Sequence, residues 1–506
     1  MSLAKKQGPG PLKHVSILAS AGSGKTFQLT NRYLQILAMG APPGSILAST
    51  FTRLAAGEIR DRILHRLAQS ANDRTRRKEL GEHINLPGLP RKRVLELLEL
   101  LAHNLHHLQI RTLDSFFGAI VRCFTYELGL PADARIVDAD EAFSLRREAI
   151  RMMLDEGEEA AIIELLTSLT EGSERAVTDT IDATVSALYE LYREADPHAW
   201  RAIDPAKVLS EEDLDRAIQA LEAAAPTGPK RTITAHAKDV LIARRCRSTS
   251  SDDWMAFVSK GLAKPIAADA PLYYRKPIEQ HVVDAYQPLI AHAQAVLRQR
   301  VINQTAATQA LLELFDRCYE RVKQQNKAIT FADLTVALAR ADMRGQLDEI
   351  CFRIDSRLHH ILLDEMQDTN IQQWTALHPI VDETISYSPE ERSFFCVGDV
   401  KQSIYGWRDA CPEVLSKIPE NLSRIGGTVI ERQSLSTSWR SSPAVIDAIN
   451  CVFDGLEQNA AMAKYLGAAR KWDLEFDRHT TVRTDLPGFV ELRTIERGED
   501  SSKRKT

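Results

Sequence analysis

The segment at residues 19–26, with the sequence ASAGSGKT, restricts the possible folds of this chain more than any other stretch. A short apolar run, His14–Ala19, leads into it, and a segment with helical periodicity, residues 27–37, follows it. A glycine-containing loop between a strand and a helix presents backbone N–H groups and a helix amino terminus to a phosphate group. The sequence therefore predicts a phosphate-binding loop in an α/β fold.

Each residue type in this loop has a physical task. Gly22 and Gly24 let the backbone approach phosphates without a Cβ atom in the way, Lys25 can reach the β- and γ-phosphates, and the Thr26 hydroxyl can ligate Mg²⁺. The usual pattern begins with Gly where this chain has Ala19, so a chance glycine-rich turn is the alternative. We expect nucleotide contacts from Ala19, Ser20, Ala21, Gly22, Ser23, Gly24, Lys25 and Thr26.

The remainder of the chain divides into regions with different patterns of apolar residues. Short apolar runs at 45–49, 360–364, 393–397 and 428–432 alternate with amphipathic segments, as in a parallel sheet with helical crossovers. Residues 140–328 instead show long helical periodicity with few strand signals. We expect 1–139 and 329–425 to form one nucleotide-binding domain, 140–328 to be an all-α insertion, and 426–506 to begin a second domain.

Size and composition agree with a multidomain protein. The 506 residues exceed the roughly 250 to 300 at which one hydrophobic core stops growing. The net charge of -5 gives no global basic signal, so any nucleic-acid binding must come from a local groove. The seven cysteines are dispersed without a Cys-x-x-Cys pair, and no apolar run reaches about 18 residues. We expect a cytoplasmic protein without a membrane span, disulfide framework or zinc ribbon.

Two acidic residues supply the partner that a phosphate-binding loop requires. The apolar run at 360–363 delivers Asp364 and Glu365 to its carboxyl end, where ligands bind in open α/β sheets. Asp364 would hold Mg²⁺, and Glu365 would polarise the attacking water. Taken alone, the pair could equally be a solvated acidic turn, but the loop upstream favours a nucleoside triphosphatase.

Four further segments resemble one helicase family. VGDVKQSIYGWRDA (397–410), LLDEMQDTN, TFTRLAAGEI and STSWRSSP resemble, in sequence and order, the UvrD/Rep-type superfamily 1 DNA helicases. The helical insertion and the start without an adenine-reading glutamine segment look more like the AddA and RecB helicase–nuclease subunits. The resemblance covers residues 14–135 and 329–453. It implies an α/β, RecA-like P-loop NTPase sheet with a large all-α insertion and the start of a second RecA-like domain.

The resemblance also implies roles for three residues near the nucleotide. Gln402 would sense the γ-phosphate, and Arg440 would contact it from the second motor domain. Trp439, at the place of the family's adenine-stacking aromatic residue, offers a larger π face than the more frequent Tyr. The alternative for Trp439 is an ordinary core tryptophan.

Other matching positions would bind single-stranded DNA. Tyr405 and Trp407 would lie on the same side of an extended segment and could stack on successive bases, which tolerates any base sequence. Arg408 resembles the arginine that links the DNA floor to the ATP site. Positions that contact the DNA backbone in the family correspond here to Phe51, Thr52, Ser115 and Phe116.

Two residues depart from the family pattern. Leu54 stands where lysine is frequent, and Asp114 stands where histidine is common. Phosphate would repel Asp114, so we expect it to orient a neighbouring hydroxyl or join the ATP-side network. Glu58 and Arg62 have the i, i+4 spacing of a helix-face ion pair.

Two other clusters have a weaker functional case. His103 and His107 have a spacing that can bind zinc, but HExxH is absent, so a solvated helix face is favoured. Basic residues in the insertion could contact duplex phosphates, although solvated charges are the favoured interpretation. These residues are Lys238, Arg244, Arg245 and Arg247.

The family's motifs V and VI and a nuclease signature are not recognisable in this sequence. We therefore expect an amino-terminal portion, a split-gene product or a cloned fragment, which binds Mg-ATP but hydrolyses it slowly. The expected function is an ATP-dependent, 3′ to 5′ DNA helicase portion in recombination or double-strand break repair. It would act on single-stranded DNA and duplex ends, and a possible partner is a second helicase–nuclease subunit.

Two alternatives remain open. One is a nucleotide-dependent DNA-binding module that is inactive without a partner chain supplying the second motor half. The other is a P-loop kinase acting on a small molecule, which would need a substrate lid in place of the Tyr405–Trp407 segment.

Overall fold

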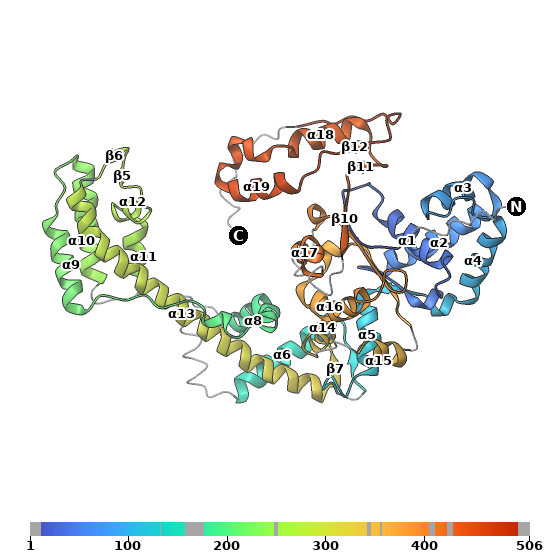
Figure 1. Cartoon of the computed structure of the whole chain (residues 1–506). Coiled ribbons are helices and arrows are strands. Elements are labelled where there is room, and N and C mark those ends of the chain that lie inside the picture. Colours follow the sequence, from blue (N-terminus) through green and yellow to red (C-terminus); the bar gives the residue numbers. More distant parts are fainter. Residues whose placement is uncertain are drawn as a thin grey trace. The chain divides into compact units, whose positions relative to one another are not determined.

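The computed structural model describes residues 12–131, 133–156, 177–246, 251–341, 346–354, 357–403, 410–422 and 429–493. The chain divides into two compact units (Figure 1). The first combines residues 1–134 with 329–506, and the second covers Arg135–Ala328, nearly the range expected for the helical insertion. Two short strands, β4 (Arg135–Ile136) and β7 (Ala328–Ile329), occur at the two junctions.

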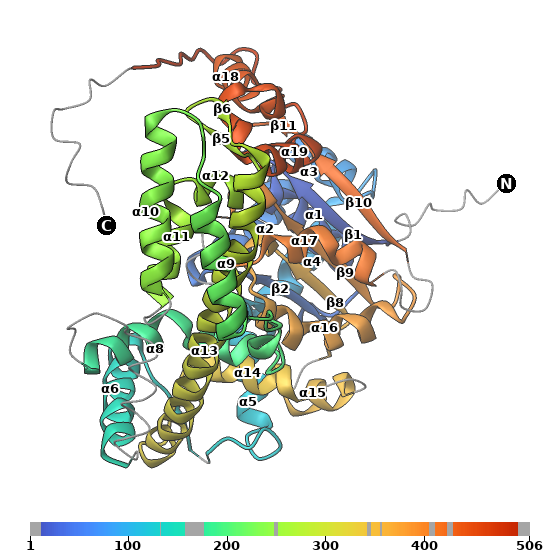
Figure 2. The same ribbon diagram turned by 90° about the vertical axis from the view of Figure 1, so that its left-hand side faces the viewer.

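A six-stranded parallel sheet organises the first unit, with the order β10-β1-β9-β8-β2-β3 (Figure 2). The strands are β1 (His14–Ala19), β2 (Ile46–Thr50), β3 (Gln109–Thr112), β8 (His360–Leu363), β9 (Ser393–Gly398) and β10 (Ile430–Leu435). Since β8 pairs with β2, segments from both ends of the sequence complete one sheet. The strand–helix alternation predicted this parallel sheet, and the family resemblance implied its RecA-like α/β architecture.

The alternation of side chains along the strands separates two hydrophobic cores. Ile46 and Ala48 of β2 pack into one core, whereas Leu47 packs into the other. In the same way Leu362 of β8 faces the first core, and Ile361 faces the second. Successive side chains of a strand point to opposite faces, so the continuous apolar runs indicate a sheet covered on both sides.

Helices cover both faces of the sheet. One core is completed by α1 (Lys25–Ala38), α2 (Arg53–Asn72), α3 (Arg74–His83) and α4 (Arg91–His103). The other is completed by α5 (Leu113–Cys123), α14 (Phe331–Arg340), α15 (Leu347–Arg353), α16 (Ile371–Ile385) and α17 (Pro412–Leu422). The i, i+4 ion pair between Arg62 and Glu58 forms on α2, at 3.3 Å.

The region assigned to a second motor domain begins inside this sheet. β10 pairs in parallel with β1, from His14 opposite Ile430 to Ala19 opposite Leu435. A boundary between two motor domains would therefore fall after Leu435 and not at residue 426. Beyond it lie β11 (Thr437–Ser438), α18 (Pro443–Phe453), α19 (Leu466–Glu475) and β12 (Thr480–Thr481), with β11 and β12 paired.

The second unit is helical. It contains α6 (Ala139–Glu156), α8 (Val177–Glu194), α9 (Glu211–Ala223), α10 (Lys230–Cys246), α11 (Ser251–Ser259), α12 (Ala263–Ala267), α13 (Gln280–Gln325) and the hairpin β5 (Leu272–Tyr273) and β6 (Lys276–Pro277). The 46-residue helix α13 contributes Tyr286 to one core and Phe315 to another. One long helix therefore carries two separate clusters.

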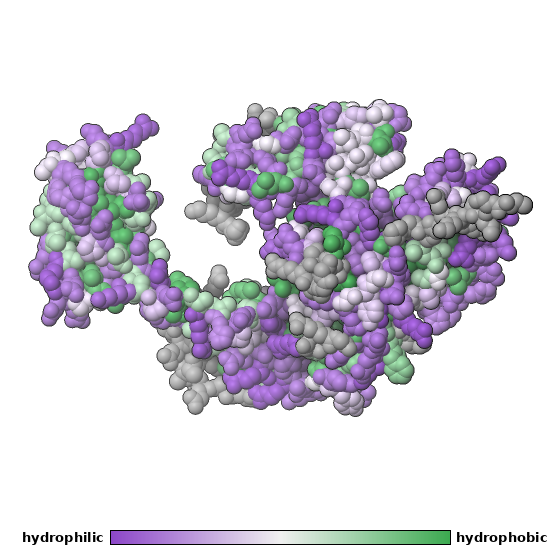
Figure 3. Space-filling model, viewed as in Figure 1, coloured by the Kyte–Doolittle hydropathy of each residue, from purple (hydrophilic) through white to green (hydrophobic). Residues whose placement is uncertain are grey.

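Hydrophilic residues cover most of the face seen in Figure 3, and apolar residues form smaller areas between them. Among the described residues, no helix is both long and apolar enough to cross a membrane.

Candidate nucleotide-binding site

The phosphate-binding loop leaves β1 and enters α1 as predicted. Gly22 and Gly24 adopt φ values of 74° and 95°, a left-handed conformation that glycine tolerates without Cβ strain. Ser23 folds the loop back, because its N–H and its hydroxyl both donate to the Ser20 carbonyl, at 3.1 and 2.7 Å. The first turn of α1 therefore points its unpaired N–H groups toward the loop, as a phosphate site requires.

Asp364 lies at the carboxyl end of β8, beside this loop. Its N–H donates to the Ser49 carbonyl at 2.8 Å, and the Thr26 side chain lies close enough to favour its charged form. Burial, followed by the nearby charge of Glu365, raises the pKa of Asp364 to about 6. The two residues predicted to hold Mg²⁺ thus lie near each other.

The charges around Asp364 fit a divalent cation. Asp368 is also buried, with one carboxylate oxygen lacking a hydrogen-bond partner, and burial raises its pKa to about 6. Three carboxylates are thus offset mainly by Lys25. No group of three or more His, Cys, Asp or Glu side chains in the described residues could hold a metal by itself. A hard cation here would therefore need oxygen ligands from phosphates or water as well.

Lys25 contacts two other segments of the predicted site. Its ammonium lies 3.0 Å from the Glu365 carboxylate and donates to the Gln402 amide oxygen at 3.0 Å. The Lys25 side chain is 10% exposed, so its charge is held in a partly dehydrated position. The structure therefore brings together Lys25, Glu365 and Gln402, which lie on separate segments of the sequence.

Trp439 and Arg440 approach the loop from the other side. The Trp439 N–H donates to the Gly22 carbonyl at 2.9 Å, and a Cβ atom on Gly22 would lie 3.0 Å from Cβ of Arg440. The Trp439 side chain is 64% exposed, which excludes the alternative of an ordinary core tryptophan in this structure. Both side chains are available to a ligand of the loop.

Comparison with known proteins agrees with this arrangement. The sequence model of the UvrD/REP helicase N-terminal domain matches residues 5–423. The chain belongs to the UvrD/REP helicase family.

Curated relatives of this UvrD/REP family member include proteins named as the A subunits of ATP-dependent helicase/nucleases. That of Clostridioides difficile (strain 630) is 23% identical over 545 residues, covering 95% of this chain and 40% of the relative. That of Desulforudis audaxviator is 28% identical over 499 residues, covering 87% and 38%. That of Bacillus pumilus is 27% identical over 504 residues, with the same two coverages. The chain thus spans about 40% of the length of these relatives.

The residues predicted to bind DNA fall into three groups in this UvrD/REP structure. Thr52 is exposed, and its hydroxyl caps α2 by accepting from the Ala55 N–H at 3.1 Å. Phe51 is half-buried, and Ser115 is exposed. Tyr405, Trp407 and Arg408 lie outside the described residues.

The prediction that Phe116 contacts DNA is wrong for this structure. Its side chain is 0% exposed and packs in the core between α5 and the sheet. A fully buried ring presents no face to a nucleic acid, because its contacts are already made by apolar neighbours. Phe116 therefore contributes to the stability of the UvrD/REP fold.

Asp114 joins the ATP side of the site. Its carboxylate accepts a hydrogen bond from the Gln373 amide at 2.9 Å. Asp114 and Gln373 line a cavity of about 20 Å³ together with Asp364 and Glu365. This volume holds roughly one water molecule. Asp114 thus lies next to the acidic pair, in keeping with the expected ATP-side network.

The two clusters with a weaker functional case have structural explanations. The helix α4 ends at His103, so His107 lies in a separate short turn, and the i, i+4 face that zinc would need does not form. Arg244 pairs with Glu222, and Arg245 pairs with Asp253 at 2.7 Å. Arg247 lies outside the described residues. Arg244 and Arg245 are therefore already neutralised by neighbouring acids.

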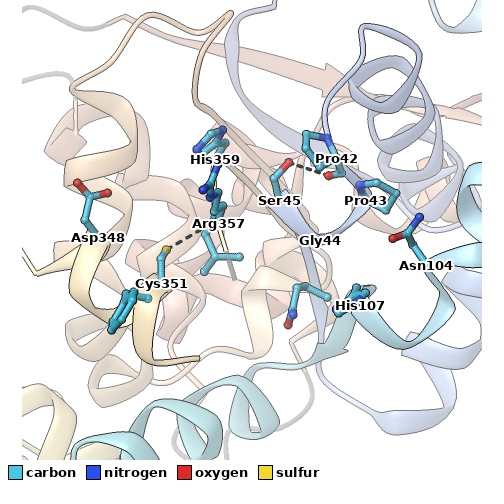
Figure 4. Close-up of a pocket in the computed structure, with 13 residues that line it drawn as sticks. Pro42, Pro43, Gly44, Ser45, Asn104, His107, Asp348, Cys351, Arg357 and His359 are labelled. Carbon is cyan, nitrogen blue, oxygen red and sulfur yellow. Dashed lines mark hydrogen bonds between the residues drawn. The ribbon is translucent and has the colours of Figure 1, made fainter. Parts of the chain in front are cut away.

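A separate pocket of about 710 Å³ lies at the opposite edge of the sheet (Figure 4). Its lining comes from the segments that lead into β2, β3 and β8, including Ser45, His107 and His359. Ligands of open α/β sheets bind at the carboxyl ends of the strands, whereas this pocket lies at the amino ends. It is distinct from the nucleotide site.

The predicted site residues did not include three residues that the structure places there: Gln367, Asp368 and Asp399. Gln367 and Asp399 hydrogen-bond each other and the predicted residues Glu365 and Gln402. A signal was present, because all three lie in the short polar segments that follow β8 and β9: Gln367 and Asp368 in DEMQDTN, and Asp399 in DVKQ.

Proposed function

We propose that this chain is the ATP-binding portion of a DNA motor that couples Mg-ATP hydrolysis to movement along single-stranded DNA. The observation that supports it most is the convergence of Lys25, Glu365 and Gln402 beside the phosphate-binding loop. A lysine for the phosphates, a base for water and an amide that senses the terminal phosphate are the components of phosphoryl transfer to water.

The individual roles follow from the geometry. Lys25 would bind the β- and γ-phosphates, and Glu365 would orient the attacking water and accept its proton. Gln402, now bound to Lys25, would exchange that contact for the γ-phosphate. Arg440 and Trp439, exposed beside Gly22, would contact the terminal phosphate and the adenine ring, respectively.

The Thr26 hydroxyl and the Asp364 carboxylate, which lie near each other, would hold Mg²⁺. When bound, the cation supplies positive charge to the phosphate oxygens during transfer.

By similarity to the helicase/nuclease relatives, we extend the proposal to 3′ to 5′ unwinding in recombination or double-strand break repair. Single-stranded DNA would contact Phe51, Thr52, Ser115, Tyr405, Trp407 and Arg408. The same proposal includes DNA duplex ends, a cytoplasmic location and a second helicase–nuclease subunit.

A DNA-binding titration tests the coupling of the two sites. Replacing both Tyr405 and Trp407 with Ala should weaken binding of a fluorescent oligothymidylate at least about 10-fold, because each stacked base contributes roughly 1 to 3 kcal/mol. Binding of a fluorescent ATP analogue should stay unchanged in the same variant. Tyr126→Ala is the matched control, since this tyrosine is 84% exposed and belongs to neither site. Unchanged DNA affinity in the double variant would contradict base stacking on Tyr405 and Trp407, and a wild type that binds no oligothymidylate would favour the P-loop kinase.

A further inference from the structure

Gln367 occupies a position between the catalytic carboxylate and the segment that carries Gln402. Its amide nitrogen donates to Glu365 Oε2 at 2.7 Å, and its amide oxygen accepts from the Asp399 N–H at 2.9 Å. The residue is 2% exposed, so it has no alternative partners in solvent. Both ends of the amide are therefore used to join two segments of the site.

The contacts continue into a closed ring. Asp399 accepts a hydrogen bond from the Gln402 amide nitrogen at 2.7 Å. The Gln402 amide oxygen accepts from Lys25 at 3.0 Å, and Lys25 returns to Glu365 Oε2 at 3.0 Å. Five residues from three separate segments thus form a cycle in which Glu365 Oε2 is bound by both Gln367 and Lys25.

The backbone at Glu365 and at Gly398 accommodates this cycle of hydrogen bonds. Glu365 has a φ of 51°, a left-handed conformation that costs a non-glycine residue energy and persists only where neighbours enforce it. At Gly398, an added Cβ atom would lie 2.5 Å from the Gln367 amide oxygen. The strand before Asp399 therefore needs glycine at this position to make room for Gln367.

The cycle of hydrogen bonds occupies the Lys25 ammonium, which is the charge that a phosphate would contact. Lys25 is paired with Glu365 in a position where its side chain is only 10% exposed. A triphosphate entering the loop competes with Glu365 and with Gln402 for the Lys25 ammonium. Nucleotide binding is therefore expected to weaken the contact between Lys25 and Glu365.

We propose that Gln367 is a positioning residue that holds Glu365 on Lys25 before nucleotide binds and links its release to the backbone at Asp399. This inference rests on the proposed function and adds a residue to it. The amide suits the task because it offers a donor at one end and an acceptor at the other. A glutamate would repel Glu365, and a methionine of similar length would lose both hydrogen bonds.

A double-mutant cycle on the full chain tests the role of Gln367. The four proteins are the wild type, Gln367→Met, Glu365→Gln and the double variant, each titrated with a fluorescent ATP analogue in the presence of Mg²⁺. Loosening Glu365 frees Lys25, so Gln367→Met should bind the analogue about 3- to 10-fold more tightly than the wild type. In the Glu365→Gln background the same substitution should change the affinity by less than about 2-fold, because the competing carboxylate is already gone.

Matched variants separate positioning from a general structural effect. Gln109→Met removes a glutamine that is 8% exposed at the amino end of β3, and it should leave the affinity unchanged. If Gln367→Met unfolds, Gln367→Asn keeps the amide but is one methylene too short to reach both partners, and it should also tighten binding. A structural role alone would weaken binding.

The outcomes distinguish this inference from the function it rests on. Weaker binding by both Gln367 variants, or an equal effect in the Glu365→Gln background, would overturn the positioning role while leaving the nucleotide site in place. A wild-type chain that binds no Mg-nucleotide, or one that binds equally well with Lys25→Ala, would overturn both.

Discussion

Lys25 and Gln402 are separated by 377 positions in the sequence, yet the lysine ammonium donates to the glutamine amide oxygen at 3.0 Å. The parallel sheet causes this proximity, because β1 and β9 are neighbours and both end at the same edge. Residues that directly follow these strands must therefore meet there. The order of strands in the sheet therefore decides which residues come together, and their separation along the chain does not.

Glu365→Gln should separate nucleotide binding from hydrolysis. The amide keeps the shape of the side chain but cannot accept a proton from water, so single-turnover hydrolysis should fall by about 10²- to 10⁴-fold. Affinity for a fluorescent ATP analogue should be retained or increased, because Lys25 loses its competing carboxylate. A variant that hydrolyses ATP at nearly the wild-type rate would show that another group acts as the base.

Gly22→Ala should damage the phosphate-binding loop. Alanine at a φ of 74° is strained, and its Cβ atom would lie 3.0 Å from both Cβ of Arg440 and the Ser438 hydroxyl. We expect a loss of affinity for the fluorescent ATP analogue. Gly57→Ala in α2 is the control, since no atom lies within 4 Å of its added Cβ atom and alanine favours a helix. Equal affinity in the two variants would contradict the close approach seen here.

Phe116→Ala should lower the free energy of unfolding by about 3 to 5 kcal/mol, as expected for a fully buried ring. Urea unfolding measures this change. Phe352→Ala, at a position 85% exposed, should change stability by less than about 0.5 kcal/mol. If Phe116→Ala were as stable as the wild type but bound single-stranded DNA poorly, the ring would belong to the DNA surface after all.

His14 should make stability depend on pH. It is 1% exposed, its Nδ1 accepts from the Phe394 N–H, and burial followed by the charge of Arg32 lowers its pKa to about 4. A histidine with a depressed folded pKa contributes stability above its unfolded pKa of about 6.5, and this is lost as pH falls through 4.

From pH 7 to pH 5 the His14 contribution amounts to roughly 2 kcal/mol of unfolding free energy. Urea unfolding at several pH values should therefore give a shallower pH dependence for His14→Gln than for the wild type. Identical slopes for the two proteins would mean that the pKa of His14 is the same in the folded and unfolded states.

The sequence predicted the sheet, and it predicted that Lys25 and Asp364 would lie at one end of it, for a physical reason. Asp364 directly follows a short apolar run and Lys25 follows the loop after another, and in a parallel sheet such positions share one edge. Local patterns therefore sufficed for them. The pairing of β10 depends on β1, which lies more than 400 residues earlier, so periodicity alone could not assign it to the first sheet.

The directions of side chains and their hydrogen-bond partners were harder to predict from the sequence. Phe116 and Phe117 are adjacent apolar residues on α5, and the motif does not say that both rings point into the core. The role of Gln367 depends on the space left by Gly398. Residues 488–495 have the pattern of a strand, but the described part, 488–493, is not paired, since a strand needs a neighbour that local sequence does not supply.

Isothermal titration of Mg-ATP into the wild type and Lys25→Ala tests the central claim most directly. Lys78→Ala is the control, because that lysine side chain is 78% exposed on α3. We predict saturable binding to the wild type and to Lys78→Ala, and at least about 10-fold weaker binding to Lys25→Ala. Equal affinity in all three proteins would contradict a triphosphate site built around Lys25.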